Sequence, residues 1–183
     1  MDRALLVIDV QKGFDQPYWG IRNNPACEEN IALLLAAFRK CSSPIVHVQH
    51  LSTEALSPLR PGQEGCQFKD VARPINGEHV ETKNVNSAFI GTGLLDYLKG
   101  RAIPQVVLCG LTTDHCVSTT TRMAANLGFD CLVAADATAT FNRTGFDGKE
   151  FSAQEIYETA LASLHGEFAN VVATRELLTI LEG

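Results

Sequence analysis

The 183-residue sequence lacks the features that mark several large classes of protein. No G-x-G-x-x-G or P-loop string follows an apolar run, which argues against a nucleotide-binding flavodoxin-like module. No apolar stretch approaches the roughly 20 residues that a membrane-spanning helix needs. The formal net charge is −6 and basic residues form no cluster, so we expect neither nucleic acid nor a membrane as a partner. The N-terminus also lacks a signal-peptide pattern, and we expect a soluble cytoplasmic protein.

The cysteines form no recognisable metal or redox motif, because no two of them have C-x-x-C spacing. Cys109 and Cys131 lie in apolar strand-like runs, and Cys27 and Cys41 bracket a predicted helix. We interpret every cysteine except Cys116 as a small buried hydrophobe or an ordinary thiol. We therefore predict no metal and no cofactor.

Apolar runs and helical periodicities alternate along the whole chain, which is 45% hydrophobic. Strands are predicted at residues 4–9, 44–49, 81–83, 105–110, 130–135 and 170–173, and helices at 27–40, 93–99, 114–127, 152–165 and the C-terminal end. A polar segment rich in Pro and Gly, residues 51–77, separates the second and third strands. This order predicts one α/β domain over residues 1–183, with a doubly wound, mostly parallel six-stranded sheet and helices on both faces.

The segment from Gly110 to Val117 carries the strongest chemical signal. A predicted strand ends there, the chain turns, and Cys116 lies at the start of the next predicted helix. Unpaired N–H groups and the positive end of the helix dipole favour a thiolate at such a position, so Cys116 is predicted to be a nucleophile. The same N–H groups suit an oxyanion.

Two further reactive residues are predicted to lie at the same edge of the sheet. Asp9 closes the first strand and Lys83 closes the third, and ligands of open α/β sheets bind beyond the carboxyl ends of the strands. Together with Cys116 they form a consistent set, in which Asp9 takes the thiol proton, Lys83 stabilises anions and the sulfur attacks a carbonyl. Taken singly, each residue has a structural alternative: a turn-capping carboxylate, a surface amine or a buried helix cysteine.

The strings around these residues resemble those of the isochorismatase-like cysteine hydrolases, in the right order and over nearly the whole chain. They are Leu6-Val7-Ile8-Asp9-Val10-Gln11, then Lys83 followed by Asn86-Ser87-Ala88-Phe89, then Gly110-Leu111-Thr112-Thr113-Asp114-His115-Cys116-Val117. The resemblance implies an Asp9, Lys83, Cys116 catalytic triad and a cis peptide between Leu111 and Thr112. It also implies an oxyanion hole formed by the N–H groups of Thr112 and Cys116.

The activity implied by this resemblance is hydrolysis of a small amide, ureide or carbamoyl compound through a thioester on Cys116, with Lys83 charged and lowering the pKa of the thiol. Members of the family include nicotinamidases and N-carbamoylsarcosine amidohydrolases. Nicotinamidases carry a metal-binding Asp-x-His after the second strand, where this chain has His50 in place of the aspartate. Three alternatives stay open: vinyl-ether hydrolysis as in isochorismatase, a non-enzymatic thiol redox sensor, and a silent binding protein.

Residues near the triad supply candidates for binding a small-molecule substrate. Phe14 and Trp19 follow the first strand and suit an apolar or planar pocket, or alternatively loop packing. Gln11 is a second candidate that equally suits a loop-fixing hydrogen bond. His115, directly before the nucleophile, either lines the cleft or points to a neighbouring subunit. The resemblance implies a homodimer or homotetramer, and residues 51–77 suit either a lid or a subunit contact.

Overall fold

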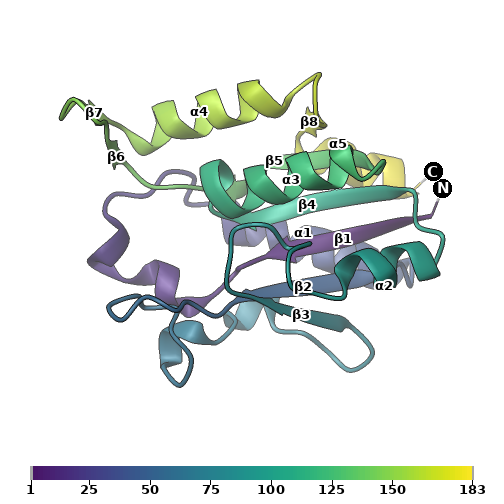
Figure 1. Cartoon of the computed structure of the whole chain (residues 1–183). Helices are drawn as coiled ribbons and strands as arrows, with labels where there is room; N and C mark the ends of the chain where they lie inside the picture. The colour runs from purple at the N-terminus through teal and green to yellow at the C-terminus, as the bar shows by residue number, and fades with distance from the viewer. Residues whose placement is uncertain (1, 183) are drawn as a thin grey trace.

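The computed structural model, which describes residues 2–182, is built around a six-stranded sheet (Figure 1). The strands are β1 (Arg3–Ile8), β2 (Ile45–His50), β3 (His79–Lys83), β4 (Gln105–Leu111), β5 (Asp130–Ala139) and β8 (Asn170–Val172). Their order is β3-β2-β1-β4-β5-β8, and every neighbouring pair is parallel. The strand order therefore reverses between β1 and β4, which confirms the predicted doubly wound sheet.

Helices cover both faces of this sheet (Figure 1). On one face lie α1 (Cys27–Lys40) and α5 (Thr174–Glu182), and on the other lie α2 (Leu94–Gly100), α3 (Ser118–Asn126) and α4 (Ala153–Leu164). The helix predicted at 114–127 is divided, because a wide π-helical turn, Thr113–Val117, precedes α3. Within residues 2–182, no helix combines the length and the apolar character needed to cross a bilayer.

Two local features were not predicted. β5 continues to Ala139, four residues beyond the expected end, and a short antiparallel pair follows it, β6 (Arg143–Thr144) with β7 (Glu150–Phe151). Strands of two residues are too short to produce an alternating pattern in the sequence, so periodicity gives no sign of them.

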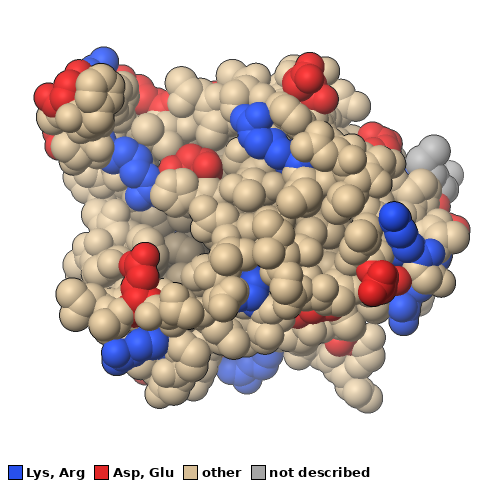
Figure 2. Space-filling model, viewed as in Figure 1, with Lys and Arg blue, Asp and Glu red and all other residues tan. Residues whose placement is uncertain are grey.

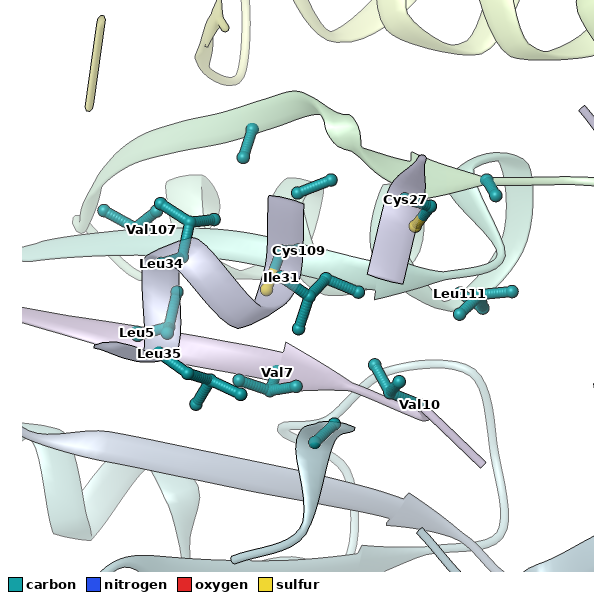
Figure 3. Close-up of a cluster of buried hydrophobic side chains, with 14 of the residues drawn as sticks. Leu5, Val7, Val10, Cys27, Ile31, Leu34, Leu35, Val107, Cys109 and Leu111 are labelled. Atoms are coloured by element: carbon teal, nitrogen blue, oxygen red, sulfur yellow. The ribbon is translucent and has the colours of Figure 1, made fainter. Parts of the chain in front are cut away.

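The central strands β1 and β4 are buried on both faces, as their unbroken apolar runs predict. On one face, Leu5 and Val7 of β1 and Val107 of β4 pack in a cluster with Ile31 and other residues of α1 (Figure 3). The opposite face packs against α2, α3 and α4. Burial of these apolar faces holds the sheet rigid and fixes the edge where β1 and β4 end.

Gly110 is required for the close approach of β1 and β4 at that edge. Its φ is +118°, and a Cβ added there would lie 2.0 Å from the carbonyl oxygen of Ile8. The pairing of β4 with β5 shifts between Leu108 and Gly110. No other residue type fits this backbone without displacing β1.

The segment 51–77 packs against the residues that follow β1. Lys69 N–H donates to the carbonyl of Val10 at 3.0 Å, and Lys12 N–H donates to that of Gln67 at 2.9 Å. The Lys69 ammonium also contacts Glu28 at 2.7 Å and Asp15, and is itself buried. These contacts join the long segment to the carboxyl end of β1 and to α1.

Helix α4 has only three buried residues, Ala153, Leu161 and Leu164. Because packing against the sheet is limited, its N-terminal cap should contribute measurably to stability. Ser152 caps its N-terminus by accepting from Glu155 N–H at 3.2 Å, while Glu155 accepts from Ser152 N–H at 2.8 Å. We expect Ser152→Ala to lower the free energy of unfolding by about 1 kcal/mol, and Ser152→Gly by a few tenths. Urea unfolding of both variants checks this, and equal losses would contradict the capping role.

Candidate active site

Asp9 lies immediately after β1 in a tight turn. Its N–H donates to the carbonyl of Val48 at 2.9 Å, and its own carbonyl accepts from Gln11 N–H at 2.8 Å. The φ of Asp9 is +50°, in the left-handed region that few non-glycine residues adopt and that Asp tolerates better than most. This turn leaves the carboxylate completely buried at the carboxyl edge of the sheet, beside β2 and β4.

The ammonium of Lys83 joins three side chains that come from separate parts of the sequence. Its Nζ lies 2.5 Å from Asp9 Oδ2, 3.0 Å from His50 Nδ1 and 3.3 Å from Cys116 Sγ. An ammonium has three N–H donors, so these three contacts use all of them. Asp9, Lys83 and Cys116 are thus brought together as predicted, from the turn after β1, the end of β3 and the π-helical turn.

The protonation state of Cys116 differs from the one we predicted. Burial raises the pKa of the thiol above its ordinary value, the nearby Asp9 carboxylate raises it further, and Lys83 lowers it without offsetting the rise. This direction favours a protonated thiol in the resting site over the thiolate that the helix start predicts. Cys116 is only 8% exposed and precedes α3, so the thiol keeps its proton until a neighbouring group accepts it.

Asp9 is the neighbouring group with the properties of such an acceptor. Burial raises the pKa of its carboxyl group, and the charge of Lys83 opposes that rise. Its Oδ1 is buried and makes no hydrogen bond within residues 2–182. A carboxylate oxygen without a donor, next to a protonated thiol, is suited to general-base chemistry.

A cavity of about 250 Å³ opens onto Asp9 and Cys116. Figure 2 shows the molecular surface hollowed on the side where β1 and β4 end in Figure 1. One wall is aromatic: the Phe14 and Trp19 ring centroids are 4.9 Å apart, and Tyr18 meets Trp19 edge-on at 5.0 Å. The remaining wall comes from His50, Ser52, Glu54, Ser57, Leu59, Asn86, Thr112 and His115.

Three of the four predicted substrate-binding residues, Phe14, Trp19 and His115, line this cavity. Gln11 does not line it, and its contacts agree with the alternative of a loop-fixing hydrogen bond. Its side chain is fully buried and donates to the carbonyls of His50 at 3.0 Å and Cys66 at 2.8 Å, while its Oε1 accepts from His50 N–H at 2.8 Å. The amide is used entirely by the backbone, so Gln11 fixes the end of β2.

Thr112 lines the cavity beside Cys116, and the peptide bond between Leu111 and Thr112 is cis, as predicted. The Thr112 hydroxyl is buried and makes no hydrogen bond within the described residues. Leaving such a polar group without a partner is unfavourable by about 1–3 kcal/mol.

Two further cavity residues, His50 and Asn86, lie outside the four residues predicted to bind substrate. His50 ends β2 and holds its Nδ1 against Lys83, and Asn86 places its Oδ1 3.7 Å from Cys116 Sγ. The available signal was position, because His50 stands at the carboxyl end of the strand that neighbours β1. Residue type alone does not separate a histidine at a site from one in the core.

Asp9, His50 and Cys116 also present the kinds of atom that bind metals, all within 4.8 Å of one another. The ammonium of Lys83 is within hydrogen-bonding distance of each of the three residues. The positively charged Lys83 Nζ therefore already lies where a metal ion would contact Asp9, His50 and Cys116. A metal ion would have to displace Lys83 from all three contacts.

A doubly wound sheet with a buried carboxylate, ammonium and thiol in contact at its carboxyl edge defines an α/β protein with a candidate catalytic site. The isochorismatase domain family matches residues 3–176. The chain belongs to this family of hydrolases.

Relatives and solved structures agree with this assignment. The uncharacterized isochorismatase family protein YrdC of Bacillus subtilis is 44% identical over 176 residues, covering 96% of this chain and 94% of the relative. A crystal structure of an isochorismatase family protein from Chromobacterium violaceum is 41% identical with a TM-score of 0.95, covering 99% of this chain and 94% of that one. Nicotinamidase 3 of Arabidopsis thaliana is 28% identical over 193 residues, covering 98% of this chain and 89% of the relative.

Proposed function

We propose that this protein is a cysteine-dependent hydrolase of a small amide, ureide or carbamoyl compound. The observation that carries the proposal is the single Lys83 ammonium that contacts both the Asp9 carboxylate and the Cys116 sulfur, two groups that line the cavity. The cavity volume of about 250 Å³ lies below the 300–1,000 Å³ typical of drug-sized ligands. The substrate is therefore a small molecule.

The first half of the proposed reaction forms a thioester. As Cys116 Sγ attacks the carbonyl carbon, its proton moves to Asp9 and the carbonyl π electrons move onto oxygen. The N–H groups of Thr112 and Cys116 hold that oxyanion. When the tetrahedral intermediate collapses, the C–N bond breaks and Asp9 returns the proton to the departing nitrogen.

The second half releases the acid. A water molecule gives a proton to Asp9 and attacks the thioester carbon, after which the C–S bond breaks and Cys116 recovers its proton. Lys83 stays an ammonium throughout, so its charge keeps Asp9 in place and partly neutralises each anion that forms. Because the resting pKa of the thiol is raised, the general base is essential to the first step.

Two observations favour this reaction over its alternatives. Vinyl-ether hydrolysis needs no thiol, yet Cys116 lines the cavity and contacts Lys83. A redox sensor needs an exposed thiolate, whereas Cys116 is buried and its pKa is raised. The similarity to a protein named nicotinamidase supports an amide among the candidate substrates.

Ammonia release and mass spectrometry together test the proposal. The protein is incubated with primary amides, ureides and carbamoyl compounds, and samples are quenched in acid before peptide mapping. We expect ammonia in equal amount to the acid product, and an acyl group on the peptide that contains Cys116. Turnover of isochorismate without any acylated peptide, and no ammonia from the panel, would favour vinyl-ether hydrolysis instead.

Removal of metal ions is expected to leave this activity unchanged. The reason is the position of the Lys83 ammonium, which occupies the centre of the one group of candidate metal ligands found in residues 2–182. The measurement is kcat/KM before and after dialysis against EDTA, and again with 1,10-phenanthroline. A loss of activity that added Zn²⁺ restores would show that a metal takes part.

A further inference from the structure

The imidazole of His50 stands between Lys83 and the cavity, and its contacts determine where its proton is. Nδ1 lies 3.0 Å from Lys83 Nζ. An ammonium only donates hydrogen bonds, so Nδ1 must accept with its lone pair. In the neutral ring the proton is then on Nε2, which makes no hydrogen bond to the protein within residues 2–182.

The surroundings keep this ring neutral. The titratable side chains grouped with it are the Lys83 ammonium of β3, the Asp9 carboxylate after β1 and the Cys116 thiol of the π-helical turn, and Glu54 and His115 line the same cavity. Burial and the charge of Lys83 lower the pKa of His50 to about 4. Near neutral pH the ring therefore offers the cavity one N–H donor and no acceptor.

Hydrogen bonds hold the backbone of His50 in place, and the contact of Nδ1 with Lys83 holds its ring. The N–H and the carbonyl of His50 both pair with the buried Gln11 amide, and the next N–H, of Leu51, donates to the carbonyl of Lys83 at 2.7 Å. His50 is thus fixed on both sides by the strands that carry Asp9 and Lys83. A donor fixed before binding loses little conformational freedom when a ligand arrives.

We propose that His50 is a specificity-determining residue, whose Nε2–H donates to an acceptor atom on the acyl part of the substrate. This rests on the proposed function. One ring nitrogen of His50 lies within 4.8 Å of the ligand atoms of Asp9 and Cys116, and both His50 and Cys116 line the same cavity, so the acceptor belongs to the part of the substrate that carries the carbonyl attacked by Cys116. The favoured substrates are neutral amides or ureides with a second acceptor, such as a ring nitrogen, carbonyl or hydroxyl. Groups that can only donate, or that carry positive charge, are disfavoured next to Lys83.

The tautomer is tested without any substrate. Two-bond ¹H–¹⁵N spectra of uniformly ¹⁵N-labelled protein distinguish protonated from unprotonated ring nitrogens, and His50→Asn and His50→Gln assign the signals. We expect Nδ1 of His50 to be unprotonated and Nε2 protonated, with no change between pH 8 and 5.5. A proton on Nδ1, or a titration midpoint near 6.5, would overturn the proposal.

The specificity is tested with benzaldehyde and the three pyridinecarbaldehydes, which have nearly the same size and differ in the ring acceptor. Each aldehyde adds reversibly to Cys116: an S–C bond forms, the carbonyl π bond opens, and the thiol proton ends on the oxygen. Trp19 is the single tryptophan of the sequence and lines the cavity, so its fluorescence reports binding. The measured quantity is the ratio of the Kd for benzaldehyde to that for each pyridine isomer.

In the wild type we expect at least one pyridine isomer to be preferred. His50→Asn keeps an acceptor for Lys83 but ends short of Nε2, so the preference should fall roughly 5- to 10-fold, the size of one neutral hydrogen bond. The intrinsic reactivities of the aldehydes affect the Kd ratio equally in the wild type and in His50→Asn, so they cancel when the two ratios are compared. No preference in the wild type, or the same ratio in both proteins, would overturn the role of His50. Aldehydes that bind Cys116→Ala as tightly as wild type would count against the proposed function, while the ring spectrum still decides the tautomer.

Discussion

Cys116→Ala is expected to lower kcat/KM by about 10⁴-fold or more while the fold is kept. The sulfur is the atom that bonds to the substrate in the proposed reaction, and without it Asp9 and Lys83 have no nucleophile to activate. The substitution removes one atom at the cavity wall, so the sheet and its helices retain their packing. The measurements are steady-state kinetics on the best substrate of the panel and urea unfolding of the same preparation.

Cys131→Ala is the matched control. Cys131 is likewise buried, and burial raises its pKa to about 12, but it lies in β5 and does not line the cavity. Its replacement should leave kcat/KM within about twofold of the wild type, with a small loss of stability. Equal kinetic effects of the two substitutions, or turnover by Cys116→Ala above a hundredth of the wild-type rate, would rule out the thioester route.

Lys83→Met is expected to destabilise the protein by about 3–5 kcal/mol and to abolish activity. It leaves the buried Asp9 carboxylate without its cation, and an unpaired buried charge is strongly unfavourable. It also removes the donor that His50 and Cys116 share. Urea unfolding and kcat/KM are measured on the same variant.

The double variant Asp9→Asn/Lys83→Met separates stability from catalysis. Removing both charges removes the unpaired carboxylate, so the double variant should regain most of the stability that Lys83→Met loses. Activity should not return, because no general base remains. The contrary result is a double variant that loses as much unfolding free energy as Lys83→Met and Asp9→Asn lose when added together. That result would show that the broken ion pair is not the source of the instability of Lys83→Met.

The loss of stability caused by Lys83→Met is also expected to depend on pH. Burial already raises the pKa of Asp9 above its ordinary value of 3.8, and Lys83→Met removes the largest influence that opposes this rise. When the pKa of a carboxyl group is higher in the folded than in the unfolded protein, the unfolded chain releases the proton first as the pH rises. The free energy of unfolding therefore falls between the unfolded pKa and the folded pKa. The free energy of unfolding of the variant should therefore be closer to that of the wild type at pH 5 than at pH 8. A deficit that is constant over this range would contradict the assignment to Asp9.

The sequence by itself determined the fold class and the members of the candidate triad. Apolar runs of four or more residues, such as that of β4, predict strands buried on both faces, and helical spacing predicts α1. Parallel strands place their carboxyl ends at one edge, so the sequence alone predicts that Asp9 and Lys83 lie near each other. These are local patterns, and each is visible within a short window of the chain.

Only the tertiary structure decided which atoms face one another and how deeply they are buried. The thiol of Cys116 has a raised pKa because elements far apart in the sequence enclose it, which no helix-start pattern reveals. Gln11 serves the backbone, and His50 meets Lys83, because residues up to 55 positions apart converge at the end of β2. Hydrogen bonding and desolvation act over a few ångströms in space, whatever the separation along the chain, so these properties appear only when the sheet is assembled.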